Sequence, residues 1–197
     1  MKAKFLLAVL VFLTAVPSFM AAQSLGQERK NHVEVGVFAD YYRFEPNSRN
    51  TINFLGVGGR AGFYMNNHAA MEAEMAYDFK RNYSTANNIN TNLTTTRVRP
   101  LHGLFGPKFD FGSHSAFFLT GKVGFVNLSS TSATAQQGFQ NSVSLDTGST
   151  RFAVYPGGGV EGFIGPVGLR VDVGDEIYFM GGAQNNLRVT FGPTFKF

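Results

Sequence analysis

The chain ends with the octet TFGPTFKF, residues 190–197. Thr190, Gly192, Phe195 and Phe197 follow the alternation of a β-strand, in which successive side chains point to opposite faces. In a soluble protein, a terminal Phe on such a strand would leave an aromatic ring in water. The same ring suits a strand that ends at the edge of a bilayer, where aromatic side chains collect. An ordinary amphipathic strand is the alternative, and the rest of the chain distinguishes the two.

The first residues have the pattern of a secretory signal peptide. A basic start, MKAK, precedes an uncharged and mostly apolar run, residues 5–16, and Ala21-Ala22 supply small residues before a cleavage site. The apolar run is shorter than the roughly 20 residues that a membrane helix needs. We therefore expect residues 1–23 to be a signal peptide and residues 24–197 to form one domain.

The composition excludes several classes of protein. There is no Cys, which excludes a disulfide framework and a lipid-modified cysteine. The chain has 17 Lys and Arg against 13 Asp and Glu, and two of the lysines lie in the signal peptide, so the domain is only weakly basic. That balance gives no case for nucleic-acid binding. Hydrophobic residues make up 44% without long apolar runs, so the hydrophobicity has to be patterned.

Eight segments alternate apolar and polar residues, as half-buried strands do. They are residues 32–42, 54–65, 69–79, 98–111, 116–126, 151–164, 167–179 and 187–197. Each is close to the roughly 9–11 residues with which a tilted strand crosses a bilayer. Short turns at 66–68, 112–115 and 165–166 alternate with longer polar loops at 45–53, 80–97, 127–150 and 180–186. The pattern predicts an all-β protein, an eight-stranded antiparallel up-and-down β-barrel.

Alternation alone does not say which face points into the barrel. A soluble lipocalin-like barrel would carry its apolar face inward. Here the polar face combines charged residues with many glycines, which pack poorly on an open surface but leave room opposite long Arg and Glu side chains in a narrow lumen. The apolar face is rich in Phe, Val and Leu, and Asp175 is the only charge assigned to it. We therefore predict a transmembrane barrel with a polar lumen and an apolar outer surface.

The inward charges are expected to neutralise one another. Glu72, Glu74 and Asp78 share one face of a strand, and paired carboxylates can perform acid–base chemistry. In a closed barrel, however, buried charges need partners, which Arg and Lys across the lumen would supply. The predicted lumen charge network comprises Arg60, Glu72, Glu74, Lys122, Glu161, Arg170, Asp172 and Arg188, and the expected partners of the three carboxylates are Arg60, Lys122, Arg170 or Arg188. Individual pairs do not follow from the sequence, because the stagger of the strands is unknown.

Two further patterns point to ligand binding only weakly. Residues 56–61, GVGGRA, fit the loose dinucleotide fingerprint, but that fingerprint needs a following helix and here the strand alternation continues. The histidines are His32, His68, His102 and His114, and their spacing is not that of metal ligands. His102 is expected to face the lumen. We expect neither a cofactor nor a metal.

With this arrangement the chain resembles the small eight-stranded outer-membrane β-barrels, namely the OmpA-like transmembrane domain and the OmpX-like porin-family proteins. The resemblance covers essentially the whole chain after the signal peptide and rests on the closing octet and on residues 69–79 and 169–173. It implies that the octet is the signal read by the barrel-assembly machinery, through Thr190, Gly192, Phe195 and Phe197. OmpA-like proteins often carry a peptidoglycan-binding domain after the barrel, whereas this sequence ends at its closing strand.

The resemblance implies a place in the outer membrane of a Gram-negative bacterium, as a monomer in contact with the lipid bilayer and lipopolysaccharide. The favoured function is non-enzymatic: structural support of the membrane, or contact with an unknown surface ligand through the polar loops. One alternative is a narrow porin-like channel, since the lumen glycines leave room for water. Another is a lipid A-modifying enzyme, which would need a His on the lipid face or outer rim, where none is assigned.

Overall fold

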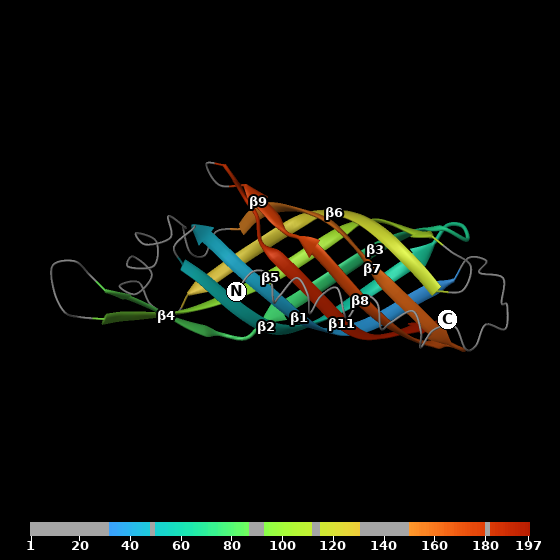
Figure 1. Cartoon of the computed structure of the whole chain (residues 1–197), viewed down its shortest axis with the longest axis horizontal. Helices are drawn as coiled ribbons and strands as arrows, with labels where there is room; N and C mark the ends of the chain where they lie inside the picture. The colour runs from blue at the N-terminus through green and yellow to red at the C-terminus, as the bar shows by residue number, and fades with distance from the viewer. Residues whose placement is uncertain (1–31, 48–49, 87–92, 112–114, 131–149, 180–181) are drawn as a thin grey trace, which may run out of the picture.

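In the computed structural model, the chain forms a closed antiparallel β-barrel (Figure 1). The structure describes residues 32–47, 50–86, 93–111, 115–130, 150–179 and 182–197. Its elements are β1 (Val33–Asn47), β2 (Asn50–Tyr64), β3 (Ala69–Asp78), β4 (Arg81–Ala86), β5 (Leu93–Phe111), β6 (Ser115–Ser130), β7 (Thr150–Ile164), β8 (Val167–Asp175), β9 (Ile177–Phe179), β10 (Ala183–Gln184) and β11 (Leu187–Lys196). The predicted signal peptide, His114 and most of the predicted loop 127–150 lie outside the described residues.

These eleven elements make eight barrel strands. β3 and β4 pair in succession with β5, and β8 and β9 pair in succession with β7. β10 pairs with β9 and β11 pairs with β8, so β10 and β11 form one further barrel strand. β11 then pairs with β1 and closes the barrel. The predicted fold class and strand number are confirmed.

Prolines account for two of these interruptions. A proline has no N–H to donate to the ladder. The ladder between β3 and β5 stops at the pair Tyr77 and Leu101, directly next to Pro100. It resumes at the pair Arg81 and Val98, with one extra residue on the β3–β4 side. The ladder between β7 and β8 likewise stops at Gly157, next to Pro156.

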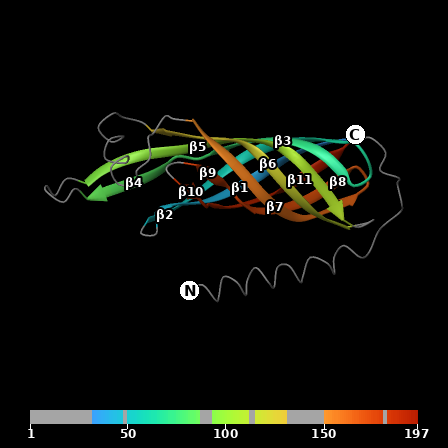
Figure 2. The ribbon, with the colours of Figure 1, turned by 90° about the horizontal axis from the view of Figure 1, so that it is seen from above.

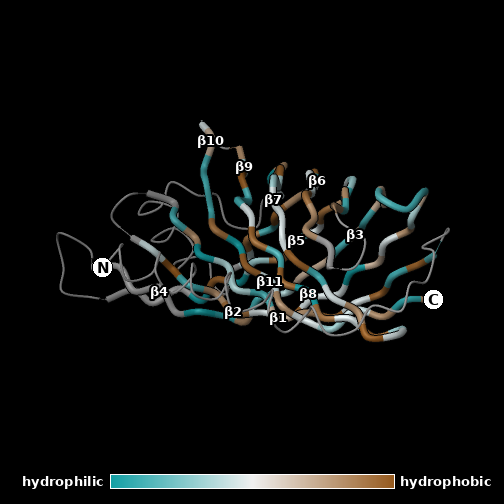
Figure 3. The backbone as a smooth tube through the Cα atoms, turned by 45° about the vertical axis from the view of Figure 1, so that its right-hand side comes forward, coloured by the Kyte–Doolittle hydropathy of each residue, from teal (hydrophilic) through white to brown (hydrophobic). Residues whose placement is uncertain are grey.

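The two faces of the strands meet different surroundings. Outward side chains are apolar and exposed, as with Val37 and Val123, which are 58% and 50% exposed. Their inward neighbours are buried and mostly polar or aromatic, so polar and apolar residues alternate along each strand (Figure 3). The predicted polar lumen and apolar outer surface are confirmed. No helix among the described residues is long and apolar enough to cross a membrane.

The stagger of the strands fixes the width of the barrel. Followed once around the barrel, the strand registers lead from Glu34 on β1 to Phe44 on the same strand, a stagger of ten residues. Eight strands tilted by roughly 35–45° enclose a space just wide enough for side chains to fill. The lumen is therefore a place where side chains from distant strands meet.

Two of the predicted loops are largely strand. β1 and β2 remain paired up to Asn47 and Asn50, within the predicted loop 45–53. β4 and β5 pair from Arg81 and Val98 to Ala86 and Leu93, within the predicted loop 80–97. Beyond a bilayer both faces of a hairpin meet water, so the apolar alternation that marks a strand is missing there. The β4–β5 hairpin extends away from the rest of the barrel (Figure 2), at the end opposite the carboxy terminus (Figure 1).

The turn between β7 and β8 shows why a glycine is needed at one point. Gly165 has a φ of 62°, in the left-handed region, and Pro166 follows it. A positive φ at the first central position and a proline-compatible φ at the second match a two-residue type II′ hairpin turn. The turn therefore joins adjacent strands with the fewest possible residues, as the sequence predicted for this end of the barrel.

Candidate functional site

The interior of the barrel concentrates charge. Among the described residues, the buried carboxylates are Glu34, Asp40, Glu72, Glu74, Asp78, Asp110, Glu161, Asp172 and Glu176, and the buried Lys and Arg side chains are Arg60, Lys108, Lys122, Arg170 and Arg188. Acidic groups thus outnumber basic ones inside the barrel, although the formal net charge of the whole chain is +4. The whole-chain balance conceals an acidic lumen.

A cluster at mid-height contains five of the predicted network residues. The Nζ atom of Lys122 lies 2.5 Å from a carboxylate oxygen of Glu72 and 2.5 Å from one of Glu74. Arg170 forms two hydrogen bonds with Glu72, and its Nη2 donates to Asp172 at 2.8 Å. Each cation therefore bridges two carboxylates, as the desolvation of buried charge requires.

A second cluster lies closer to the long hairpins and is centred on Arg188. Its guanidinium binds Asp40 through Nε and Nη2, at 2.9 and 2.8 Å from Oδ2. Its Nη1 lies 2.8 Å from Glu74 and 3.4 Å from Glu176. One fully buried side chain on β11 thereby connects β1, β3 and the junction between β8 and β9.

His102 lies between two carboxylates in the same region. Its ring nitrogens lie 2.7 Å from Glu176 and 3.2 Å from Asp78, and the side chain is buried. The position of His102 in the lumen agrees with the prediction. The expectation that Arg or Lys would neutralise Asp78 is wrong, because the ion-pair partner of Asp78 is His102. No pattern in the sequence singles out this pair, since 24 residues separate the two.

A third cluster occupies the short-turn end of the lumen. The Nζ atom of Lys108 lies 2.6 Å from Glu161, 3.4 Å from Asp110 and 3.6 Å from Glu34. It also donates a hydrogen bond of 2.8 Å to the hydroxyl of Tyr64. Of these residues, only Glu161 belonged to the eight named from the sequence.

Aromatic rings fill much of the remaining space. The Phe38 ring lies under the guanidinium of Arg60, 4.3 Å from the ring centroid, and against Gly58, where a Cβ atom would be 2.3 Å from the ring. Tyr155 lies against Gly174 in the same way, and its hydroxyl donates to Asp172 at 2.8 Å. The glycines were expected to make room for long Arg and Glu side chains. At these positions they make room for aromatic rings instead.

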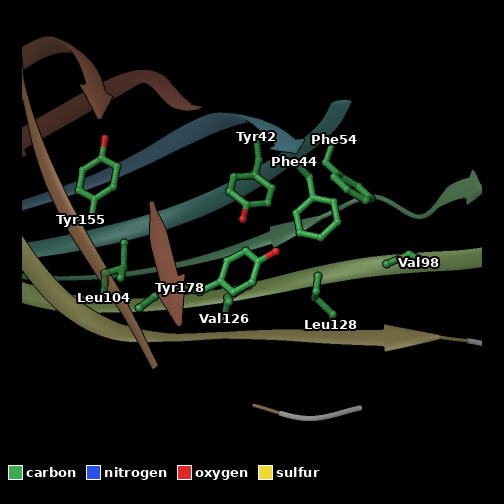
Figure 4. Packing of buried hydrophobic residues seen from close by; sticks show 10 residues of the cluster. Tyr42, Phe44, Phe54, Val98, Leu104, Val126, Leu128, Tyr155 and Tyr178 are labelled. Carbon is green, nitrogen blue, oxygen red and sulfur yellow. The ribbon is translucent and has the colours of Figure 1, made fainter. Parts of the chain in front are cut away.

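A cluster of buried hydrophobic residues, here called the aromatic cluster, packs inside the barrel on the side of the long hairpins (Figure 4). Tyr42, Phe44, Phe54 and Tyr178 are fully or almost fully buried. Phe44 stacks on Tyr178 with 6.0 Å between ring centroids and meets Phe54 edge-on at 6.3 Å. Val98, Leu104, Val126, Leu128, Ala153 and Tyr155 complete the cluster. Sequence analysis missed it, although the parity of these positions along their strands places them inward.

The family model of the outer membrane protein beta-barrel domain matches residues 8–195, nearly the whole chain. The chain belongs to this family. As a member, it is a small β-barrel protein of the Gram-negative outer membrane, which confirms the predicted family and localisation. In such barrels the short turns face the periplasm and the long hairpins face outward.

Two solved outer-membrane barrels share the fold. Neisserial surface protein A is 13% identical with a TM-score of 0.56, over 84% of this chain and 97% of that one. Ail, the attachment invasion locus protein of Yersinia pestis, in complex with the heparin analogue sucrose octasulfate, is 13% identical with a TM-score of 0.52, over 87% of this chain and all of that one. At this identity the likeness concerns the fold alone. No curated protein sequence matches the chain.

Two groups of buried Asp, Glu and His residues in the described part of this outer-membrane barrel have a geometry that could hold a metal ion. They are Asp40, Asp78 and His102, and Glu72, Glu74 and Asp172, with ligand atoms within 4.8 Å of one another. In the second group the ammonium of Lys122 already lies between two carboxylates. In the first, the guanidinium of Arg188 binds Asp40. In both groups, therefore, a Lys or Arg side chain already binds carboxylates that a metal would need.

The predicted assembly signal of the outer-membrane barrel lies on its closing strand. Thr190 and Gly192 point inward and are buried, whereas Phe195 and Phe197 are 39% and 79% exposed at the periplasmic end. β11 pairs with both β1 and β8, so these residues belong to the seam of the barrel. Recognition by the assembly machinery stays a prediction.

Proposed function

We propose that this protein is a non-conducting, non-enzymatic scaffold of the outer membrane that holds its extracellular hairpins in place for contact with a surface partner. The observation that carries the proposal is the filling of the lumen by three ion-pair clusters and, at the extracellular end, by the aromatic cluster. A scaffold benefits from such an interior because buried networks of paired polar groups make a structure rigid.

The filled lumen argues against the alternative of a channel. An ion that entered from outside would first meet Tyr42, Phe44, Phe54 and Tyr178, whose rings are packed against one another. Below them it would have to pass Arg188, which is fully buried and bound to three carboxylates. The interior of an eight-stranded barrel is just wide enough for inward side chains of this kind to fill it.

Two features favour a role in surface contact. β5 has 19 residues, well beyond the roughly 9–11 that cross a bilayer, and the β4–β5 hairpin extends outside the membrane (Figure 2). Binding residues often lie on loops held by a rigid scaffold. Ail, which shares the fold, carries attachment in its name. We extend that kind of role to this chain as part of the proposal.

The positions of the described histidines support a non-enzymatic role. A lipid-modifying enzyme needs its base where a lipid can reach it. His102 has two acidic partners but is buried in the lumen, on the inner face of the barrel wall. His32 and His68 lie at the periplasmic end. Expression of the protein should therefore leave the mass of lipid A unchanged, and a new lipid A species would contradict the proposal.

Single-channel recording separates the scaffold from the channel. We expect the refolded protein, shown to be closed by its heat-modifiable gel mobility, to give no steady current steps in a planar bilayer. A variant with Phe44→Ala and Tyr178→Ala tests the aromatic cluster, and Phe152→Ala with Phe179→Ala removes a stacked pair of the same kind from the outer surface. Steady steps from the wild-type protein would overturn the proposal.

The surface role needs a second experiment. Replacing residues 83–96 by a short turn removes the projecting hairpin and leaves the membrane-spanning part of the barrel intact. We expect bacteria that carry this variant to lose adhesion to surfaces that the wild type binds, with unchanged barrel closure and outer-membrane level. Equal adhesion by both strains would remove the β4–β5 hairpin from the proposed contact.

A further inference from the structure

The base of the β4–β5 hairpin is strongly basic. Lys80 and Arg81 lie where β3 gives way to β4, and Arg97 and Arg99 lie on the neighbouring strand β5. Arg81 pairs with Val98 and Asn82 pairs with Arg97, whereas Lys80 and Arg99 lie in the interruption before this ladder, so the four cations lie close together in the chain at the base of the hairpin. Residues 79–101 contain no Asp or Glu. We call Lys80, Arg81, Arg97 and Arg99 the hairpin basic patch.

Within the described part of the chain, the hairpin basic patch has no carboxylate partner. None of its four side chains takes part in an ion pair there, and Lys80, Arg81 and Arg97 are exposed. Arg43, at the same end of the barrel, differs, because its Nη2 lies 2.5 Å from Glu45. An exposed group of unpaired cations is costly through mutual repulsion and favours an anionic partner.

The height of the patch relative to the membrane indicates where that partner lies. Outward residues of β5 are apolar from Phe109 and Phe105 up to Leu101, and the next two outward positions are Arg99 and Arg97. Leu101 pairs with Tyr77, an aromatic residue that is 40% exposed on the outer surface. The arginines therefore begin one step above the apolar band, where lipid headgroups lie.

Contacts with Tyr77 hold one of the arginines at this height. Nη1 of Arg99 donates a hydrogen bond of 2.6 Å to the Tyr77 hydroxyl, and its guanidinium lies over the Tyr77 ring at 4.8 Å from the centroid. Because one guanidinium presents five donors, the remaining N–H groups stay available to a further acceptor. The aromatic ring thus positions Arg99 at the boundary between the apolar band and water.

We propose that the hairpin basic patch binds phosphate groups of lipopolysaccharide in the outer leaflet. Guanidinium groups bind phosphate with two parallel hydrogen bonds, and each Lys or Arg near an anionic membrane surface adds to the affinity. A lipid is favoured over a soluble polyanion because Arg97 and Arg99 continue the lipid-facing column of β5 directly. The site lies on the barrel wall, so it is independent of whether the lumen conducts and of what the loop tips bind.

The test compares two variants with equal change of net charge. Arg97→Gln with Arg99→Gln removes two cations from the patch, and Arg43→Gln with Arg151→Gln removes two others from the same end of the barrel. Binding of the refolded proteins in neutral detergent to immobilised lipopolysaccharide is measured. We expect the patch variant to bind about 25-fold more weakly than the wild type, roughly fivefold for each cation, and the control variant to bind within about twofold.

Three results would overturn the inference. Equal losses in both variants would show a general effect of net charge. An undiminished difference with dephosphorylated lipopolysaccharide would exclude phosphate as the group bound. A patch variant that keeps its lipopolysaccharide affinity but loses binding to a soluble sulfated oligosaccharide would assign the patch to a soluble polyanion. Heat-modifiable mobility of every variant establishes that the barrels compared are closed.

Discussion

Lys122 and Val123 are neighbours in β6 and lie at almost the same depth in the membrane, yet they face opposite surroundings. Lys122 is 1% exposed inside the barrel, where its ammonium bridges Glu72 and Glu74. Val123 is 50% exposed on the outside, where lipid surrounds it. The inner position requires one particular charge at one particular place, whereas the outer position requires only an apolar side chain. Substitutions on the two faces should therefore follow different rules.

The largest effect is expected from Arg188→Met on the inner face. Arg188 is shared by Asp40, Glu74 and Glu176, and its loss leaves buried carboxylates without a cation. The free energy of unfolding should fall by about 3–5 kcal/mol, measured by urea titration in phospholipid vesicles. Arg43→Met, which removes an exposed ion pair, should cost about 0–1 kcal/mol. Equal losses would mean that the inner charges are not coupled as described.

Val123→Arg tests the outer face with the opposite change, a charge added. An arginine on the lipid face near the bilayer midplane should lower the free energy of unfolding by about 2–4 kcal/mol. The same substitution at Asn127, which is outward and near the extracellular end of β6, should cost about 0–1 kcal/mol because the penalty fades toward the interface. Equal losses in the free energy of unfolding at positions 123 and 127 would contradict this prediction.

Gly58→Ala is expected to have an intermediate effect, through packing alone. The new Cβ atom would lie 2.3 Å from the Phe38 ring, so the ring and the overlying Arg60 have to move. Overpacking of this kind costs about 1–3 kcal/mol in the free energy of unfolding. Gly121→Ala is the matched control, since nothing lies within 4 Å of its Cβ position on the outer face. A neutral Gly58→Ala would show that the lumen repacks freely.

The smallest effect is expected from Val37→Leu on the outer face. Val37 is 58% exposed to lipid, and an apolar side chain of similar size should leave the free energy of unfolding within about 0.5 kcal/mol. The same vesicle-based titration measures it. A loss above about 1 kcal/mol would instead indicate a specifically packed neighbour on this face, such as a second copy of the chain, and would contradict the expected monomer.

The sequence predicts well on which face of a strand each residue lies, but it predicts poorly which residues across the lumen pair with one another. Strict alternation places Glu72 and Glu74 on one face and Met75 on the other without any knowledge of the fold, because the period of a strand is two. The charged and glycine-rich composition of the first face then identifies it as the inward one. The partners depend on the stagger of ten residues around the barrel, which no local pattern encodes. Thus Arg188 on β11 meets Asp40 on β1, 148 residues away in the chain.

The inner aromatic residues were missed for a different reason. Phe38 and Tyr42 are aromatic residues on the otherwise polar face of β1. A prediction that separates the two faces by their apolar residues therefore does not place them in the lumen. Their parity, shared with Asp40, does place them inward. The strand ends were misplaced because the β4–β5 hairpin lies outside the bilayer, where neither face is selected for hydrophobicity.

The pairing of Arg188 with Asp40 has a consequence for the order in which the barrel can form. Arg188 lies on the last strand of the chain and Asp40 on the first, so the two meet only when β11 docks on β1. Contacts between the ends of a chain are the slowest to form. An open, partly inserted sheet would hold Asp40, Glu74 and Glu176 without their shared cation, so it gains little until the final strand arrives. We therefore expect closure to be all-or-none, so that a chain that lacks β11 stalls before assembly rather than settling as a smaller barrel.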